Sequence, residues 1–348
     1  MEVVSSTSLL IEISSTDSSQ IGHARRKAGS LAAALGFEEL RLGELSIIVT
    51  EAARNIATHA TEGQIILCPW VLDGQTGIDV YALDRGPGIH DIARAREDGF
   101  STAGTPGQGL GAISRLADGM QIYSSSDAGT ALFTRIFREA EQGAKSNPSI
   151  NTADETDRFA LGAISIPIAG ESVCGDAWSS DHKANRSIYI VADGLGHGPL
   201  AAEASEEALR VFHSMPDQTP ERILKEIHGA LAKTRGAAVS IAEILHKERI
   251  VNYAGAGNIV GAIHSAGRTR NMVSMNGTVG HSVARLQQLT YPWDRNSTLI
   301  MHSDGLTTRW NVEQYSGLAS RHPALMAGVL FRDFRRERDD ATVLVTRR

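Results

Sequence analysis

Hydrophobic residues along this chain gather into short runs that favour strands, separated by stretches in which they recur at helical spacing. The run from Ile188 to Ala192 is apolar, ends at Asp193 and leads into the glycine-rich turn 194–198. The alanine-rich stretch from Pro199 to Phe212 then has the composition of a helix. We therefore expect a buried strand that ends in a carboxylate facing a cleft, beside glycines whose backbone carbonyls can approach a hard cation.

Further acidic residues border other β-like runs in the C-terminal half. They are Asp176, Asp304 and the pair Asp339 and Asp340. A single Asp-Gly pair is an ordinary turn signal. Four such positions, however, would gather carboxylates at one end of a sheet sandwich. Because oxygen ligands favour Mg²⁺ or Mn²⁺ over zinc, the pattern predicts a site for one of these ions.

The N-terminal part carries a different pattern. A hydrophobic run that ends near Ile13 predicts a first strand, and residues 20–35 predict a capped helix. From Glu38 to about Ala60, apolar residues recur every three or four positions and define one face of a second helix. Glu51 and Asn55 are four residues apart and share one side of this helix. Most such pairs belong to a solvated face, so the interpretation depends on the motifs that follow.

Two glycine-rich turns come next. The strand-like run from Ile78 ends in Asp84-Arg-Gly-Pro-Gly88, and Gly107-Gln-Gly-Leu-Gly111 opens a helix that continues through Leu116. One glycine-rich loop is a weak signal. A glycine turn that leads into a helix N-terminus can nevertheless bind phosphate through its backbone amides. The segment 255–261 is expected to be a hairpin-like turn between two later strands.

Length and composition limit the possible classes of protein. The 348 residues are enough for two domains, and 139–157 contains almost nothing that could pack, so we predict a linker between domains 1–138 and 158–348. With 34 basic and 40 acidic residues and no basic stripe, nucleic-acid binding is disfavoured. Cys68 and Cys174 have no metal-type spacing and are expected to be reduced core thiols. The sequence has no signal-peptide pattern and no bilayer-length apolar run, so we expect a cytoplasmic protein without membrane association.

The C-terminal motifs resemble those of the PPM (protein phosphatase 2C-like) serine/threonine phosphatases, most closely their SpoIIE/RsbX branch. The matching segments are Gly175-Asp176, Asp193-Gly-Leu-Gly-His-Gly198, Ala254-Gly-Ala-Gly-Asn258, Ser303-Asp-Gly305 and Asp339-Asp-Ala-Thr342. The resemblance covers roughly residue 158 to the C-terminus. It implies an α-β-β-α sandwich and a protein phosphatase that uses two Mg²⁺ or Mn²⁺ ions, which activate water and neutralise the substrate phosphate. The implied metal ligands are Asp176, Asp193 as the bridging and catalytic residue, the carbonyl of Gly194, Asp304 and Asp339.

Some residues near these motifs remain open. Asp339 is preferred to Asp340 because the first acidic residue of this motif is the ligand in the family pattern. His197 could serve as a general acid or could hydrogen-bond locally within its turn. Arg186 and Arg309 lie near the motifs in sequence, but their position alone does not decide whether either contacts phosphate.

The N-terminal motifs resemble the GHKL (Bergerat) ATP-binding fold, an α/β sandwich, and within it the RsbT-type anti-sigma-factor kinases. The match spans most of residues 5–138 and includes the segment 98–103. By this resemblance Asn55 would ligate the Mg²⁺ that bridges the nucleotide phosphates, and Glu51 would be the base at a protein hydroxyl. Asp84 would hydrogen-bond the adenine amine. The remaining implied ATP-binding residues are Gly86 and Gly88 at the base, Gly107, Gly109 and Gly111 around the phosphates, and Thr130 beside the adenine pocket.

Together the resemblances imply an α+β chain in which an RsbT-like ATP-binding module is fused to a PPM phosphatase. Its expected substrate is a phosphorylated STAS-domain antagonist in a partner-switching pathway. Two alternatives remain: the N-terminal module could bind ATP and gate the phosphatase without kinase activity, or it could sequester a partner. The sequence leaves the oligomeric state and the identity of the partner open.

Overall fold

A computed structural model describes residues 7–72, 74–95, 109–126, 128–139, 160–283 and 285–347. Its contacts divide the chain into two compact units. One contains Ser8–Asp157 together with Tyr315–Arg332, and the other contains Arg158–Gln314 together with Asp333–Arg348. The predicted linker 139–157 lies almost entirely outside the described residues, so the domain boundaries stay a prediction.

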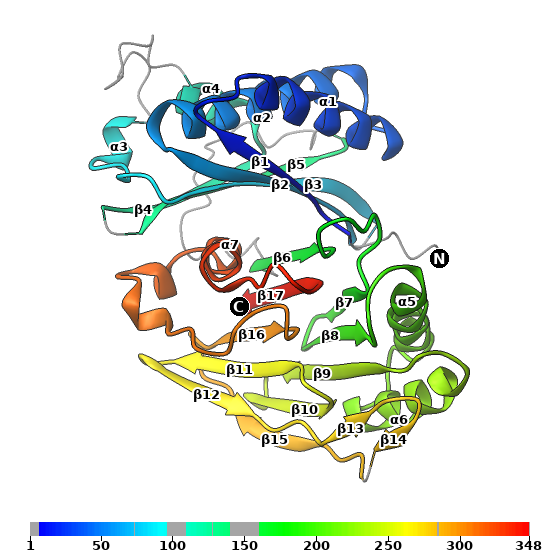
Figure 1. The fold of residues 1–348 in the computed structure, drawn as a ribbon. Helices are drawn as coiled ribbons and strands as arrows, with labels where there is room; N and C mark the ends of the chain where they lie inside the picture. The colour runs from blue at the N-terminus through cyan, green and yellow to red at the C-terminus, as the bar shows by residue number, and fades with distance from the viewer. Residues whose placement is uncertain are drawn as a thin grey trace. The chain divides into compact units, whose positions relative to one another are not determined.

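The N-terminal unit is built on a five-stranded antiparallel sheet in the order β1-β2-β3-β5-β4. Its strands are β1 (Leu9–Ser14), β2 (Glu62–Leu72), β3 (Gln75–Asp84), β4 (Gly119–Ser125) and β5 (Gly129–Phe137). Its helices are α1 (Ser19–Ala34), α2 (Glu39–His59), the short α3 (Ile92–Ala95) and α4 (Gly109–Leu116). In Figure 1 the helices α1, α2 and α4 lie over one face of the sheet.

Helix α2 forms where the apolar periodicity predicted it. Its buried residues include Leu45, Ile48, Ala52 and Ile56, which pack with strand residues in the hydrophobic core of this unit. Because these positions recur every three or four residues, one stripe of the helix faces the sheet and the opposite side stays polar. The unit also contains the C-terminal segment Tyr315–Arg332, in which the His322 ring stacks on Phe133 of β5 with centroids 5.2 Å apart.

The C-terminal unit contains two five-stranded antiparallel sheets, in the orders β15-β10-β9-β8-β7 and β12-β11-β16-β17-β6. The first is made of β7 (Asp176–Lys183), β8 (Arg186–Gly194), β9 (Ala237–Leu245), β10 (Ile250–Ala256) and β15 (Leu289–Pro292). The second is made of β6 (Ala160–Ile166), β11 (Val260–Ser265), β12 (Arg268–Met272), β16 (Thr298–His302) and β17 (Ala341–Arg347). A small ribbon joins β13 (Gly277–Thr278) and β14 (Ser282–Val283).

Alternation along the strands builds two cores in this unit. Tyr189 and Val191 of β8 point into the core between the sheets, where they meet Leu299 and Leu344 of the second sheet. Ile188, Ile190 and Ala192 face the opposite side and pack under the helices α5 (Pro199–Ser214) and α6 (Pro220–Ala230). The short 3₁₀ turns Leu231–Lys233 and Val312–Gln314 also belong to this unit. The turn Leu318–Ser320 and most of helix α7 (Pro323–Phe334) lie in the segment that belongs to the N-terminal unit. The expected combination of an α/β sandwich and a two-sheet sandwich is confirmed.

One expectation about the strands is wrong. The segment 255–261 does not close a hairpin, because β10 pairs with β9 and β15 whereas β11 pairs with β12 and β16. The chain therefore crosses from one sheet to the other at this point. Gly257 has φ of 102°, and a Cβ there would lie 2.4 Å from the Cβ of Ala238, so this crossing needs glycine.

Candidate functional site

The predicted metal ligands meet at one end of the C-terminal sandwich. Asp176, the first residue of β7, is the register partner of Asp193 near the end of β8. Asp304 lies two residues beyond the end of β16, and Asp339 lies two residues before β17, the strand that pairs with β16. The two sheets are joined there, because the Ser303 hydroxyl lies 2.6 Å from the Asp176 carboxylate. Strand edges from both sheets therefore bring the acidic motifs together, as the sequence pattern predicted.

The electrostatics of this cluster suit divalent cations. Burial, followed by the charges of Asp176, Asp304 and Asp339, raises the pKa of Asp193. Burial also raises the pKa of Asp176, whose exposed fraction is 3%, and burial followed by the charge of Asp304 raises that of Asp339. In each case burial and the neighbouring carboxylates disfavour the ionised form, and a bound cation would stabilise that form. Within the described residues no group of three histidine, cysteine or acidic side chains has the close spacing of an assembled metal site.

Asp340 has a different environment from Asp339. Its carboxylate accepts hydrogen bonds from the backbone N–H groups of Ile168, at 2.7 Å, and Gly175, at 2.9 Å. Asp340 is 2% exposed, whereas Asp339 is partly exposed. Asp340 therefore ties together the loops that carry the acidic motifs. This arrangement agrees with the choice of Asp339 as the ligand, which stays a prediction.

The glycines of the Asp193 motif allow a close approach of strand and helix. A Cβ on Gly194 would lie 2.0 Å from the carbonyl oxygen of Ala201, so the end of β8 packs directly against α5. Gly198 has φ of 73° and leads into Pro199, the first residue of that helix. His197 is exposed, and its Nδ1 lies 2.8 Å from the carboxylate of Glu171, a partner 26 residues away and outside its own turn.

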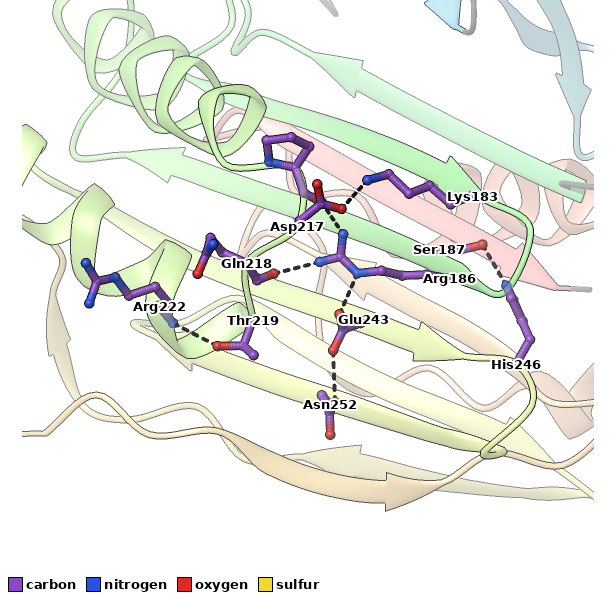
Figure 2. Close-up of polar contacts among 11 residues, drawn as sticks. Lys183, Arg186, Ser187, Asp217, Gln218, Thr219, Arg222, Glu243, His246 and Asn252 are labelled. Atoms are coloured by element: carbon purple, nitrogen blue, oxygen red, sulfur yellow. Dashed lines mark hydrogen bonds and ion pairs between the residues drawn. The ribbon is translucent and has the colours of Figure 1, made fainter.

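Arg186 was one candidate for binding phosphate, but it has a structural environment instead. Figure 2 shows its guanidinium between the Glu243 carboxylate, at 2.5 Å, and the carbonyl oxygen of Gln218, at 2.7 Å. Glu243 also accepts a hydrogen bond from Asn252 at 2.9 Å. Arg186 and Asp193 occupy opposite ends of β8. The buried ion pair therefore fixes the loop between α5 and α6. The other candidate, Arg309, is exposed.

The polar side of α2 forms the second candidate site. A Cβ on Gly109, the first residue of α4, would lie 3.2 Å from Glu51 Oε2 and 3.3 Å from Asn55 Oδ1. The glycine-rich turn therefore ends directly over the two residues that the sequence grouped. Arg54 Nη1 lies 2.6 Å from Glu51 Oε1 on the same helix. Gly107 and the segment 98–103 lie outside the described residues.

Backbone hydrogen bonds also fix the position of the Asp84 carboxylate at the end of β3. This carboxylate accepts the backbone N–H groups of Gly86, at 2.8 Å, and Thr130, at 3.2 Å, and burial raises its pKa. Gly88 has φ of 75°, and a Cβ there would lie 2.5 Å from the carbonyl oxygen of Ser125. An open groove of about 640 Å³ next to this turn is lined in part by Gly86 and by His59 at the end of α2. Gly111 is buried within α4.

Some contacts in the first site were not anticipated. The hydroxyls of Ser303 and Thr342 both hydrogen-bond to Asp176. Both residues belong to motifs that the sequence identified, and their hydroxyls adjoin the acidic residues that were predicted as ligands. Among the described residues, no helix is long and apolar enough to cross a membrane. Cys68 and Cys174 are both buried free thiols.

Comparison with known families assigns both units. Residues 14–136 match the histidine kinase-like ATPase domain model, and residues 183–348 match the model for stage II sporulation protein E (SpoIIE). The chain is 38% identical over 109 residues to the serine/threonine-protein kinase RsbT of Bacillus subtilis, covering 31% of this chain and 82% of RsbT. It is 30% identical over 138 residues to the phosphoserine phosphatase RsbX of the same organism, covering 39% of this chain and 69% of RsbX.

The fold of this chain is also similar to that of a solved structure. That structure was described in work on the bacterial stressosome as a modular system adapted to control secondary messenger signaling. Its sequence is 25% identical to this chain, and the two structures superpose with a TM-score of 0.51. The match covers 54% of this chain and 99% of that one. The chain therefore belongs to the RsbT family of serine/threonine kinases through its N-terminal part and to the RsbX family of PPM-type serine/threonine phosphatases, which act in partner switching, through its C-terminal part.

Proposed function

We propose that the C-terminal unit removes phosphate from a phosphoserine or phosphothreonine of a partner protein with the help of two Mg²⁺ or Mn²⁺ ions. The observation that carries this proposal is the convergence of acidic residues from both sheets, with the pKa values of Asp176, Asp193 and Asp339 all raised. When bound, two divalent ions supply the neutralisation of phosphate charge and the activation of water that this hydrolysis requires. Asp193 would bridge the ions, because the charges of Asp176, Asp304 and Asp339, the other proposed carboxylate ligands, all raise its pKa.

The remaining ligands follow from the positions of the strands. Asp176 pairs with Asp193 across β7 and β8, and Gly194 continues the same strand, so these residues would hold one ion. Asp304 and Asp339 interact with each other through a side-chain hydrogen bond and would hold the second ion. All proposed ligand atoms are oxygens, which favours Mg²⁺ or Mn²⁺.

The N-terminal unit is proposed to bind ATP with Mg²⁺ and to phosphorylate a protein hydroxyl. Asn55 would ligate the ion, Glu51 would act as the base, and Asp84 would bind the adenine amine. The closeness of Gly109 to the side chains of Glu51 and Asn55 supports this arrangement, because it sets the N-terminus of α4 beside the two residues that α2 contributes. The free backbone N–H groups of a helix N-terminus can bind phosphate.

Both activities are proposed to act on the same partner, a small STAS-domain antagonist. The kinase relative and the phosphoserine phosphatase relative catalyse opposite reactions on protein hydroxyls. Their fusion in one chain would waste ATP unless something makes the two activities exclusive. A shared substrate would make the chain a switch whose direction depends on ATP, metal or a bound partner.

The test uses the purified full chain with candidate STAS proteins, with and without ATP and Mn²⁺, followed on phosphate-affinity gels and by mass spectrometry. Glu51→Ala should abolish phosphorylation and leave dephosphorylation intact, because only the kinase step needs a base at the hydroxyl. Asp304→Asn should do the reverse and let phosphorylated partner accumulate. Modification of different residues or different proteins by the two activities would exclude the shared substrate. ATP binding without any transfer in the wild-type chain would favour a nucleotide-gated phosphatase.

A further inference from the structure

Two buried hydroxyls hold the carboxylate of Asp176. Ser303 Oγ lies 2.6 Å from Asp176 Oδ2, and the Thr342 hydroxyl makes a second side-chain hydrogen bond to the same carboxylate. Ser303 and Thr342 both have an exposed fraction of 0%. They come from the Ser-Asp-Gly and Asp-Asp-Ala-Thr motifs, so each acidic motif of the second sheet also contributes a hydroxyl to an aspartate of the first.

The direction of the Ser303 hydrogen bond follows from its other partner. The backbone N–H of Thr342 donates to Ser303 Oγ at 3.0 Å, and the backbone N–H of Ser303 donates to the carbonyl of Thr342, also at 3.0 Å. A hydroxyl has one proton to donate. Because Ser303 Oγ already accepts from Thr342, its proton is available for the Asp176 carboxylate.

Thr342 is held in a similar way. Its hydroxyl lies 2.7 Å from the hydroxyl of Ser165, which is also fully buried. If Thr342 donates to the Asp176 carboxylate, Ser165 donates to Thr342, and every proton in the chain has an acceptor. The two hydroxyls therefore fix the orientation of the carboxylate from two directions.

A second pair of side chains supports the backbone at Ser303. Trp310 Nε1 donates to His302 Nε2 at 2.9 Å, and because an indole N–H can only donate, His302 Nε2 is the acceptor. The proton of the neutral ring then lies on Nδ1, which is 2.7 Å from the carbonyl oxygen of Ser303. His302 has no exposed surface. The loop that carries Asp304 is thus held rigidly beside β17.

We propose that Ser303 and Thr342 are positioning residues that orient the Asp176 carboxylate for a divalent cation. This inference rests on the proposed function, in which Asp176 is a metal ligand. Neither hydroxyl is proposed as a ligand, because the protons of both point toward the carboxylate and Ser303 Oγ also accepts an N–H. Partners that orient a metal ligand typically change metal affinity by about 10- to 100-fold when they are removed.

The test is calorimetric titration of Mn²⁺ into the full chain without ATP, with wild type, Ser303→Ala and Thr342→Val. We expect each variant to bind Mn²⁺ about 10- to 100-fold more weakly. The matched control is Ser187→Ala, which removes a serine hydroxyl that is 1% exposed and bonded to His246 at the other end of β8 (Figure 2). This control should bind Mn²⁺ as wild type does.

Thermal unfolding in chelator separates positioning from general stability. A purely structural role would lower the midpoint of the metal-free variants and leave Mn²⁺ affinity per folded molecule unchanged, and that result would overturn the proposal. Should Ser303→Ala fail to fold, Thr342→Val carries the test, because valine keeps nearly the shape of threonine and removes only the hydroxyl. Wild-type affinity in Thr342→Val would then refute the inference. Absence of Mn²⁺ binding in the wild type would instead refute the proposed metal site itself.

Discussion

Replacing Asp193 by asparagine is expected to inactivate the phosphatase and, in the absence of metal, to stabilise the fold. Asparagine keeps nearly the volume of aspartate and removes its charge. Burial and the neighbouring carboxylates raise the pKa of Asp193. Below about pH 4 this carboxyl is protonated in both the folded and the unfolded chain and has no effect on stability. At higher pH the unfolded chain ionises it freely and the folded chain does not, so the folded state loses stability as the pH rises.

The size of this effect follows from the pKa shift. One pKa unit corresponds to about 1.4 kcal/mol. The pKa of Asp193 is raised to about 9, so at pH 7.5 the folded chain keeps this carboxyl protonated about 3.6 units above its free pKa, and we expect Asp193→Asn to gain up to about 5 kcal/mol in the free energy of unfolding. Mn²⁺ should reverse or narrow the difference, because an ion at 100 times its dissociation constant stabilises the wild type by about 2.7 kcal/mol. Asp193→Asn lacks the charge of the proposed bridging carboxylate, so Mn²⁺ should stabilise this variant much less than the wild type.

The assay is urea unfolding of both proteins in EDTA and in Mn²⁺, followed by tryptophan fluorescence. Trp178, Trp293 and Trp310 lie in the C-terminal unit and report on it. The control is Asp217→Asn, which changes an exposed carboxylate that pairs with Lys183 and should leave the midpoint unchanged. If Asp193→Asn is less stable than wild type in EDTA, or if its phosphatase activity is retained, the assignment of Asp193 to the centre of a repulsive metal-binding cluster is wrong.

Three further predictions concern other parts of the chain. Gly109→Ala should weaken Mg²⁺-ATP binding at least about tenfold by calorimetry, since its methyl group would press against Glu51 and Asn55 of α2. The control Gly43→Ala adds a methyl group with no atom within 4 Å and should bind Mg²⁺-ATP as wild type does. Equal binding by the two variants would contradict the proposed ATP site. Arg186→Met should lower the free energy of unfolding in urea by about 3 to 5 kcal/mol, because it leaves the Glu243 carboxylate buried and unpaired. Adding Glu243→Leu should restore most of that free energy. A loss below about 1 kcal/mol in Arg186→Met would argue against a buried ion pair. Burial lowers the pKa of His182 to about 4. Between pH 6.5 and 4 the His182 ring is therefore protonated in the unfolded chain and neutral in the folded chain. The free energy of unfolding should therefore fall as the pH falls from 6.5 to 4, and His182→Gln should remove up to about 3 kcal/mol of that fall. Parallel plots of the free energy of unfolding against pH for wild type and His182→Gln would disprove this prediction.

Much of this protein is determined by patterns that act over short distances. The apolar periodicity of α2 placed Glu51 and Asn55 on its polar side, and the β-rich run before Asp193 placed that carboxylate at a strand end. Helical spacing, strand alternation and glycine turns depend on neighbouring residues. For this reason local patterns predicted the elements and the acidic strand edges, whereas the fold class was implied by the resemblance of the motifs to two known families.

The tertiary structure alone decided which distant positions meet. Ser303 and Asp176 are separated by 127 residues, and their hydrogen bond exists because β16 and β7 end at the same edge of a two-sheet sandwich. Arg186 is close to Asp193 in sequence, yet a strand advances about 3.3 Å per residue, which carries the arginine to the far end of β8 and into a buried pair with Glu243. The crossing at Gly257 was likewise set by strand order. Local patterns contain no information about sheet order, so these contacts could be read only from the folded chain.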